Sequence, residues 1–557
     1  MQKANPLKWL ISRSKKQSGK IVALIIANAV FSVLSVLFAF AIKEIIDSAT
    51  VYGDLNRLIS FAVAICLIVV FQFVFRVLIN GLTEHIRAKL EMEYRSRIFS
   101  QILIKKQDKI SSYHSGELMN RLTSDTSVVA DGVSTIVPTV VSAGVRLICA
   151  VIALIILDWV FAIAFTVAGL LVFLVISLVR GKLKSLHKKV QETDGKTRSF
   201  MQECIENLLA LKVFAVNNKI EKQAELYQEE NFKVRMRRKN YSVIGHATYN
   251  FIFSAGYLFA LIYGGIKILS GILTYGSLSA ILQLVNNVQV PFASLSNVLP
   301  KYYAMTASAE RLMEIEDVEI EPVGKPISKA EFNGKFSGIT FDNVSFAYDD
   351  KKVLSNANLV VNKGDFVMIE GGSGAGKSTL LKLLLGVYPL DEGEIYASCD
   401  GDKLILDSKT RSLFSYVPQG NMIFSGTLRE NVTFINETAD ENEIWRALKI
   451  SQADEFIKEL PDGLETFVGE NGLGLSQGQV QRIAIARAIL CDAPVLILDE
   501  ATSALDEDTE KRLLDNLKEL KDVTALIVSH KKGAAKICNR RVKVGSKRII
   551  ECEKAVL

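Results

Sequence analysis

Six long apolar segments in the first 300 residues constrain the fold of this chain more than any other feature of its sequence. Each can cross a hydrocarbon core, which takes about 20 helical residues. The segments lie near residues 21–42, 58–82, 133–157, 159–179, 243–269 and 273–298. A bilayer offers no partners to backbone polar groups, so such segments span it as helices. The sequence predicts an all-α membrane domain over residues 21–310, preceded by an interfacial helix within residues 1–20.

Basic residues predict the orientation of these segments. The long connections at 83–132 and 180–242 are rich in lysine and arginine, whereas the short ones offer only Lys43 and Arg57. By the positive-inside rule, the N-terminus, both long connections and all residues after the sixth segment are cytoplasmic. Membrane topology also explains the net charge of +6, so we expect no nucleic-acid partner.

The long connections show helical spacing of apolar residues, which predicts that the spanning helices continue beyond the membrane. The pattern breaks at Asp108–Ser115 and around Arg198–Asn218. We expect short transverse helices at these breaks, able to contact another domain. Ordinary solvated helical hairpins are the alternative.

Several polar residues lie inside the apolar segments, where they are costly and usually face a partner or a water-filled cavity. They are Arg146 in the third segment, His246, Tyr249, Asn250, Tyr257 and Tyr263 in the fifth, and Gln283, Asn286, Asn287 and Gln289 in the sixth. Either substrate contact or hydrogen bonding between helices explains any single one. As a group they favour a translocation cavity lined by the third, fifth and sixth helices.

A linker at residues 311–337 and a soluble α/β domain at 338–557 follow. The domain contains a glycine loop between an apolar run, Phe366–Glu370, and a helical one. Its residues are Gly371, Gly372, Ser373, Gly374, Ala375, Gly376, Lys377, Ser378 and Thr379. Strand, glycine loop and helix form the context of a phosphate loop, which cradles phosphates with backbone N–H groups. Lys377 would reach the β- and γ-phosphates and Ser378 would ligate Mg²⁺. The chain is thus expected to bind a nucleoside triphosphate.

A second apolar run, Val495–Leu498, ends in two carboxylates. A buried strand there would deliver Asp499 to the metal or its water ligands, and Glu500 could polarise an attacking water. A further short strand, Ala525–Val528, is followed by Ser529 and His530. His530 could contact the γ-phosphate, or it could be structural.

The motifs of this domain and their order along the chain resemble those of a known protein family. Leu475-Ser476-Gln477-Gly478-Gln479 is similar to the signature loop that defines ATP-binding-cassette (ABC) proteins together with the phosphate loop and the Asp499-Glu500 strand. Tyr348 matches the adenine-stacking aromatic residue, Gln419 the glutamine between γ-phosphate and membrane domain, and Asp506 the loop at the dimer seam. His530 matches the switch histidine. Phe467–Gly472, Ser115–Leu118 with Arg121, Leu122 and Asp125, and Ala307–Arg311 also resemble family segments.

The resemblance implies a half-transporter of the exporter type, with six membrane helices fused to one ABC nucleotide-binding domain. Two chains would sandwich two ATP molecules, each between the phosphate loop of one and the signature of the other. Glu500 would act as catalytic base, with Gln419 and His530 as further catalytic residues, and Ser378, Gln419 and Asp499 would hold Mg²⁺. We expect an integral protein of the bacterial plasma membrane that couples ATP hydrolysis to efflux of an amphipathic peptide, lipid or drug.

Four departures from the family pattern leave alternatives open. Gln477 stands where the family usually has glycine, and Lys531 and Lys532 follow the histidine in place of the usual arginine. Residues 398–412 and the C-terminal end after Ala534 are short and divergent. A homodimer is preferred, because symmetric homo-oligomers are the commoner case, but a heterodimer is possible. The divergent cassette slightly favours a peptide substrate. An exporter-shaped importer of siderophores and a non-transporting membrane ATPase sensor are the alternatives.

Overall fold

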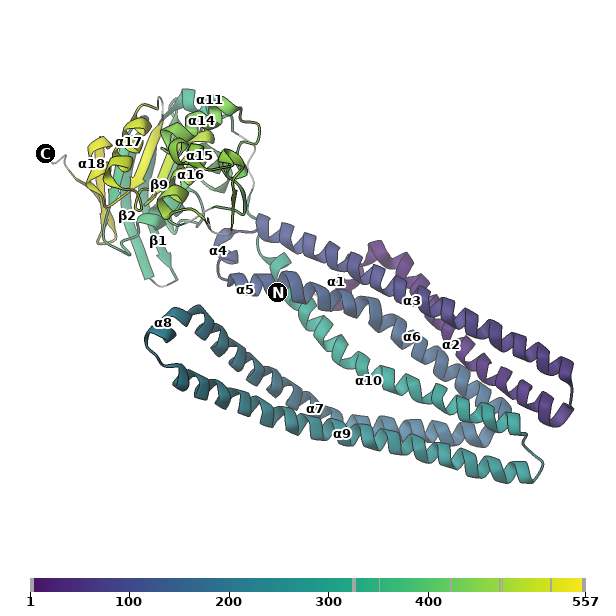
Figure 1. Ribbon diagram of the computed structural model, residues 1–557. Helices are drawn as coiled ribbons and strands as arrows, with labels where there is room; N and C mark the ends of the chain where they lie inside the picture. Colours follow the sequence, from purple (N-terminus) through teal and green to yellow (C-terminus); the bar gives the residue numbers. More distant parts are fainter. Residues whose placement is uncertain are drawn as a thin grey trace. The chain divides into compact units, whose positions relative to one another are not determined.

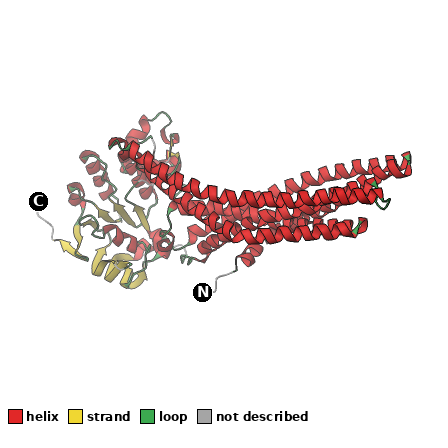
Figure 2. Cartoon of the chain, turned by 90° about the horizontal axis from the view of Figure 1, so that it is seen from below, coloured by secondary structure: helices red, strands yellow, loops and turns green. Residues whose placement is uncertain are grey.

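The computed structural model of the chain describes residues 5–322, 327–349, 351–420, 423–469, 472, 474–520 and 523–552. Pro326, Glu470 and Asn471, which the sequence placed in the linker and before the signature, lie outside these residues. Two compact units are present: Met1–Leu103 with His114–Asp317, and Ile104–Tyr113 with Val318–Leu557. Helices make up the first unit, and all the strands drawn belong to the second (Figure 2).

Long helices dominate the first unit (Figure 1). The helices are α1 (Pro6–Arg13), α2 (Ser18–Asp47), α3 (Leu55–Ile104), α5 (Ser115–Asn120), α6 (Thr126–Leu157), α7 (Trp159–Glu206), α8 (Leu208–Val213), α9 (Asn217–Leu269) and α10 (Tyr275–Asp317). The short helices α4 (Gln107–Ile110) and α8 lie at the two predicted breaks. Because α10 continues to Asp317, the beginning of the segment predicted as linker is helical.

Four helical stretches of the described residues are long and apolar enough to cross a membrane: Lys15–Tyr52, Leu55–Ile104, Ser115–Leu157 and Asn217–Leu269. In α7 the described residues give a shorter apolar stretch, Trp159–Gly169. The most apolar window of α3 has no buried residue, as expected for a helix that faces lipid. These helices make the chain an integral membrane protein. That all six long helices span the bilayer stays a prediction.

Small residues allow the long helices to pack closely. Helix α10 packs on α2 and α6, and α7 pairs with α9. The shared core includes the buried alanines Ala39, Ala150, Ala153, Ala260 and Ala280. At Gly132 of α6, an added methyl group would lie only 2.6 Å from the sulfur of Met305 in α10, so this crossing requires glycine. Close approach of this kind is how membrane helices gain packing energy in the absence of a hydrophobic driving force.

The N-terminal helix α1 is tied to the ends of two long helices. Glu316, near the end of α10, accepts hydrogen bonds from Trp9 Nε1 (3.0 Å), Arg13 Nη2 (2.9 Å) and Arg97 Nε (2.6 Å). The Trp9 ring also stacks on Tyr94 of α3. Burial acts to raise the pKa of Glu316, but these hydrogen bonds outweigh it and leave the pKa below its ordinary value.

The described residues of the second unit form two large sheets and a small one, in which β7 (Gly426–Thr427) pairs with β8 (Phe467–Val468). One large sheet is antiparallel, in the order β2-β1-β4-β5, from β1 (Phe336–Tyr348), β2 (Lys351–Asn362), β4 (Glu392–Cys399) and β5 (Asp402–Ile405). The other large sheet has the order β12-β11-β3-β10-β9-β6, from β3 (Phe366–Glu370), β6 (Phe414–Val417), β9 (Val495–Asp499), β10 (Thr524–Val528), β11 (Arg540–Gly545) and β12 (Arg548–Cys552). Strands β11, β3, β10, β9 and β6 are parallel, so their carboxyl ends share one edge. The strands predicted at 366–370 and 525–528 are β3 and β10.

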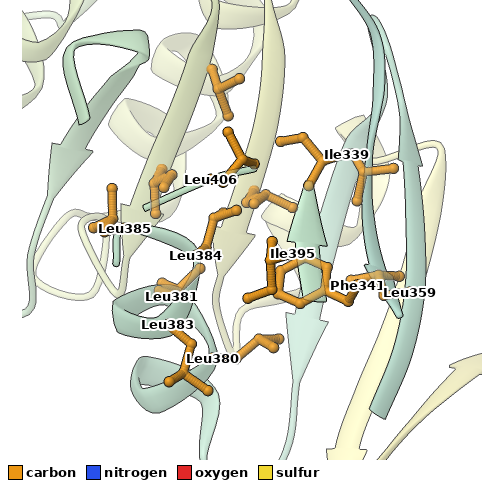
Figure 3. Close-up of a cluster of buried hydrophobic side chains, with 14 of the residues drawn as sticks. Ile339, Phe341, Leu359, Leu380, Leu381, Leu383, Leu384, Leu385, Ile395 and Leu406 are labelled. Atoms are coloured by element: carbon orange, nitrogen blue, oxygen red, sulfur yellow. The ribbon is translucent and has the colours of Figure 1, made fainter. Parts of the chain in front are cut away.

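Helix α12 (Lys377–Leu384) covers the space between the two large sheets. Its leucines Leu380, Leu381, Leu383 and Leu384 are at most 1% exposed and pack with residues of β1, β2 and β4 such as Ile339, Phe341, Leu359 and Ile395 (Figure 3). Four of its eight residues are leucines, and six of the eight are buried, so most of the helix surface is covered. This core fixes where the helix begins, and therefore where the phosphate loop stands. The all-α membrane domain followed by an α/β nucleotide-binding domain confirms the predicted fold class.

Candidate functional site

The glycine loop Gly371–Gly376 connects β3 to α12 at the carboxyl edge of the parallel sheet. Gly374 and Gly376 have φ of 75° and 104°, in the left-handed region that glycine tolerates without strain. A Cβ at Gly371 would lie 2.4 Å from the carbonyl of Val544. The loop therefore needs its glycines both for its turn and for its packing. Its backbone leads into the N-terminus of α12, where partial positive charge favours phosphate.

Lys377 is buried, and its ammonium donates hydrogen bonds to the carbonyls of Gly371 (2.8 Å) and Gly372 (3.2 Å). The loop thus holds the lysine inside its own curve, where an arriving phosphate would compete with these carbonyls for it. Ser378 and Thr379 follow in the first turn of α12. Ser373 and Ala375 complete the predicted loop, in which Ala375 donates its N–H to Gly372 at 3.1 Å.

Asp499 ends β9 and is 1% exposed. Its Oδ1 has no hydrogen-bond partner among the described residues, and the hydroxyl of Tyr416 donates to Oδ2 at 3.5 Å. Burial raises the pKa of Asp499, an effect that the nearby Ser378 hydroxyl opposes. An unpaired buried carboxylate oxygen beside a serine hydroxyl is a donor set that fits a hard divalent cation such as Mg²⁺.

Glu500, Gln419 and His530 come together from three strands of the parallel sheet. Gln419 Nε2 donates to Glu500 Oε2 at 2.7 Å, and His530 Nε2 lies 3.8 Å from Oε1. Glu500 has a φ of 54°, in the left-handed region where a non-glycine residue is strained, and its N–H donates to the carbonyl of Val528. This backbone conformation occurs directly after β9, at the carboxyl edge of the sheet. All three predicted catalytic residues thus share one cluster.

The predicted signature residues form the start of helix α16 (Gln477–Leu490). Ser476 and Gln479 build a reciprocal cap, in which each side chain accepts the other's backbone N–H. Gln477 is exposed and does not have positive φ, so the backbone there does not require glycine. Gly478 passes so close to the next loop that a Cβ would lie 3.0 Å from the carbonyl of Ala504.

Two other predicted residues have clear structural partners. Tyr348 is 37% exposed, its ring packs edge-to-face on Phe346 and Tyr388, and its hydroxyl lies 3.5 Å from Thr379 Oγ1. The ring is therefore held beside the first turn of α12. Asp506 caps helix α17 (Glu507–Lys518) by accepting the N–H of Thr509 at 2.9 Å. That backbone hydrogen bond lowers the pKa of Asp506.

Sequence reasoning missed two residues that hold the loop at 501–506. Gln481 of α16 donates to Ser503 Oγ (2.9 Å) and accepts the N–H of Ala504 (3.0 Å). Lys531 donates to the carbonyls of Thr502 (2.9 Å) and Leu505 (2.6 Å). The sequence marked Lys531 only as a departure from the family pattern, and its spacing gave no sign of these contacts.

A polar cavity of about 210 Å³ lies among the long helices of the first unit. Its lining residues are Ser35, Phe38, Gln72, Arg146, Gln283, Asn286 and Asn287. They come from the first, second, third and sixth predicted spans. The fifth helix, which was expected to line a translocation cavity, contributes no residue to this cavity. In the fifth helix, Tyr249 instead donates to the carbonyl of Gln289 at 2.9 Å, a contact between helices. The side chain of His246 lies outside the described residues.

Arg146 dominates this cavity chemically. Its Nη2 donates to Ser35 Oγ at 2.8 Å, while its buried Nε has no hydrogen-bond partner among the described residues. Asn287 donates to the carbonyl of Ser35, and no lining residue carries a carboxylate. An arginine with no counter-ion among the lining residues, surrounded by amide and hydroxyl groups, is suited to bind an anionic group.

Comparisons with known proteins agree with this arrangement. The family described as ABC transporter transmembrane region matches residues 21–292, and the family described as ABC transporter matches residues 354–503. The chain is 30% identical to an ATP-dependent lipid A-core flippase of Desulfotalea psychrophila, over 94% of this chain and 92% of the relative. A flippase of the same description from Legionella pneumophila (strain Philadelphia 1) is 31% identical, over 95% and 90%.

One solved structure, of a bacterial Atm1-family ABC exporter with ATP bound, superposes with a TM-score of 0.82. It covers 96% of this chain and 95% of that chain at 22% identity, which supports the fold. The chain carries the membrane region and the nucleotide-binding region in one polypeptide, and its relatives match over nearly their whole length. The chain therefore belongs to the ABC transporter family, as a half-transporter of the exporter type that binds and hydrolyses ATP to drive transport across a membrane.

Proposed function

We propose that this protein moves a lipid with an anionic headgroup out of the cytoplasmic leaflet of a bacterial plasma membrane. The observation that carries the proposal is the cavity around Arg146. A guanidinium in a low-dielectric bilayer is costly unless an anion pairs with it, and none of the residues lining the cavity supplies one. A phosphate or carboxylate on an amphipathic substrate would supply that partner.

The relatives favour a lipid over a peptide or a drug. Flippases described as acting on lipid A-core resemble this chain over nearly its full length. The long lipid-facing surface of α3 suits a substrate whose acyl chains stay in the bilayer while the headgroup enters the cavity. The proposal therefore replaces the slight preference for a peptide that the divergent cassette suggested.

In the proposed working form, two identical chains sandwich two ATP molecules with the nucleotide-binding domains and N-termini in the cytoplasm. Exposed apolar side chains at Leu209, Val213 and Phe214, around α8, support a second copy as their cover. ATP would bind on Gly371–Thr379 with Tyr348 against the adenine, and Ser476 to Gln479 of the other chain would close over the γ-phosphate.

Glu500 would act as general base on the attacking water, and Gln419 and His530 would orient it and the γ-phosphate. Ser378, Asp499 and Gln419 would hold Mg²⁺, which neutralises charge on the phosphates when bound. ATP-driven closure of the two cassettes would turn the cavity outward, and hydrolysis would reset it.

The test is lipid-stimulated ATP hydrolysis in proteoliposomes. Lipid A and phosphatidylglycerol should stimulate the wild-type protein, whereas phosphatidylcholine should not. In Arg146→Gln, the half-saturating lipid concentration should rise about tenfold, the effect of losing about 1.4 kcal/mol of charge-assisted binding. Arg87→Gln, which removes a partly exposed arginine paired with Glu84, is the matched control and should leave stimulation unchanged.

Equal stimulation by neutral and anionic lipids, or an unchanged response in Arg146→Gln, would refute the proposed headgroup. Transfer of a labelled anionic lipid between leaflets then tests direction. Movement toward the cytoplasmic leaflet would instead support the importer interpretation.

A further inference from the structure

Two segments of the second unit form a small structure that we call the clip, consisting of Ile104–Lys106 and Val318–Glu321. Lys105 and Ile320 pair as an antiparallel β-bridge. The N–H of Lys106 donates to the carbonyl of Glu319 (3.0 Å), and that of Glu321 donates to the carbonyl of Ile104 (2.8 Å). In the chain, these segments directly continue α3, which ends at Ile104, and α10, which ends at Asp317. The clip therefore joins the ends of two long helices.

Lys105 strengthens the clip from inside. It is only 4% exposed, and its ammonium donates to the carbonyl of Val318 at 2.6 Å. Lys106 forms an ion pair with Glu319 on the outer side. With backbone and side-chain hydrogen bonds in both directions, the two segments are expected to move together.

Arg411 binds the clip to the nucleotide-binding domain. Its two terminal nitrogens donate to both carboxylate oxygens of Glu321, at 2.7 and 2.8 Å. The same guanidinium donates to the carbonyls of Leu385 (2.7 Å) and Gly386 (2.9 Å). These carbonyls lie at the C-terminal end of α12, the helix that begins at Lys377. One side chain thus connects the end of the phosphate-loop helix to the clip.

The backbone around Arg411 is fixed by close packing. Gly386 has a φ of 59°, and a Cβ there would lie 2.5 Å from both the Asp407 carbonyl carbon and the Ser408 nitrogen. Asp407 and Thr410 form a reciprocal cap on the 3₁₀ helix Ser408–Leu413, which contains Arg411. Ser408 Oγ also donates to the carbonyl of Pro322, directly after the clip. The divergent segment, residues 398–412, therefore holds Arg411 in place beside the clip.

We propose that Arg411 and Glu321 are the positioning pair that transmits movement of α12 to the ends of α3 and α10. ATP meets α12 at its N-terminal end, and Arg411 responds at the opposite end of the same short helix. A bidentate arginine–carboxylate pair fixes orientation as well as distance, so rotation of α12 is passed to the clip and not absorbed by a rotating side chain. The inference rests on ATP-driven transport and is independent of the lipid headgroup.

The test uses the full-length protein in proteoliposomes, in a cysteine-free background. Nitroxide labels at the exposed positions Asn56, near the start of α3, and Ser270, directly after α9, report on the long helices through electron–electron distances. Distances are measured without nucleotide and with ATP plus orthovanadate. In Glu321→Ala, the fraction of molecules that changes distance should fall about fivefold or more, while the Kd for ATP stays within about twofold of wild type.

Glu551→Ala is the matched control. Arg540 binds Glu551 through two nitrogens and also donates to the carbonyl of Val360, as Arg411 binds Glu321 and two carbonyls, but this pair lies away from the clip on β11 and β12. It should keep the full ATP-dependent change in distance. In an Arg411→Gln background, Glu321→Ala should cause no additional loss. A full distance change in Glu321→Ala, or a parallel loss of ATP binding in that variant, overturns the proposal.

Discussion

Replacing Lys531 should slow ATP hydrolysis although this side chain is not expected to touch ATP. Lys531 donates to the carbonyls of Thr502 and Leu505, within the loop that ends at Asp506. Its ammonium also lies 3.7 Å from Glu510, whose side chain is 3% exposed and accepts a hydrogen bond from Thr502 Oγ1. Lys531→Met therefore removes two hydrogen bonds from the loop and leaves a buried carboxylate without its cation.

The magnitude follows from these contacts. A hydrogen bond to a charged group contributes about 1.5–3 kcal/mol when buried. The side chain of Lys531 is about a third exposed, so solvent screening reduces the combined contribution of its two hydrogen bonds to about 2 kcal/mol. If the loop must be ordered at the dimer seam for hydrolysis, this loss lowers kcat/KM for ATP by about 30-fold.

The assay compares kcat/KM for ATP in Lys531→Met, Lys531→Arg and Lys536→Met. Lys536 is an exposed lysine of the next helix and serves as the control for loss of charge. Arginine retains the charge and donors, so Lys531→Arg should recover most of the activity. Wild-type kcat/KM in Lys531→Met, at an equal folded fraction, would refute the reasoning.

Two further predictions concern stability. The hydrogen bonds to Glu316 lower its pKa, so they stabilise the attachment of α1 at any pH above the ordinary pKa of glutamate. This stabilisation is lost as the pH falls through the lowered pKa. Trp9 fluorescence should report release of α1 at acid pH and, in Glu316→Gln, partial release already at pH 7. Gly386→Ala combines left-handed backbone strain of about 1–2 kcal/mol with a backbone clash. Gly463→Ala, at φ 51° with open space around its Cβ, has the strain alone. The melting temperature should therefore fall clearly further in Gly386→Ala, and equal falls would contradict the packing described for Arg411.

Much of the architecture could be predicted because its signals are local. Apolar length predicted the long helices, and the breaks at 108–115 and 198–218 predicted α4 and α8. The glycine loop between an apolar run and a helical one predicted β3, the loop and α12, because turn geometry and burial are encoded within a few residues. The roles of Tyr348, Gln419, Ser476 and Asp506 came from the family resemblance, because single residues of these types indicate no particular function on their own.

What the sequence could not predict are contacts between distant segments. Nothing in the spacing pairs Glu321 with Arg411, or Lys531 with the carbonyl of Thr502, since a backbone acceptor has no side-chain signature. The cavity was expected from the third, fifth and sixth segments, but the Arg146 cavity takes residues from the first and second instead of the fifth. Which side of a membrane helix faces a cavity depends on how its neighbours rotate, and hydropathy alone does not specify rotation.

Placing two lesions in one copy or in separate copies tests whether each ATP site is shared between two copies of this chain. Lys377→Ala removes the phosphate-loop lysine and Ser476→Ala the signature serine. Differently tagged chains allow dimers of defined composition to be purified and their ATP hydrolysis measured. If sites are shared, one lesion in each copy disables one site and leaves the other intact, whereas both lesions in one copy disable both sites. Shared sites should give higher activity for the separated lesions, and equal or reversed activities would show that the sites are not shared.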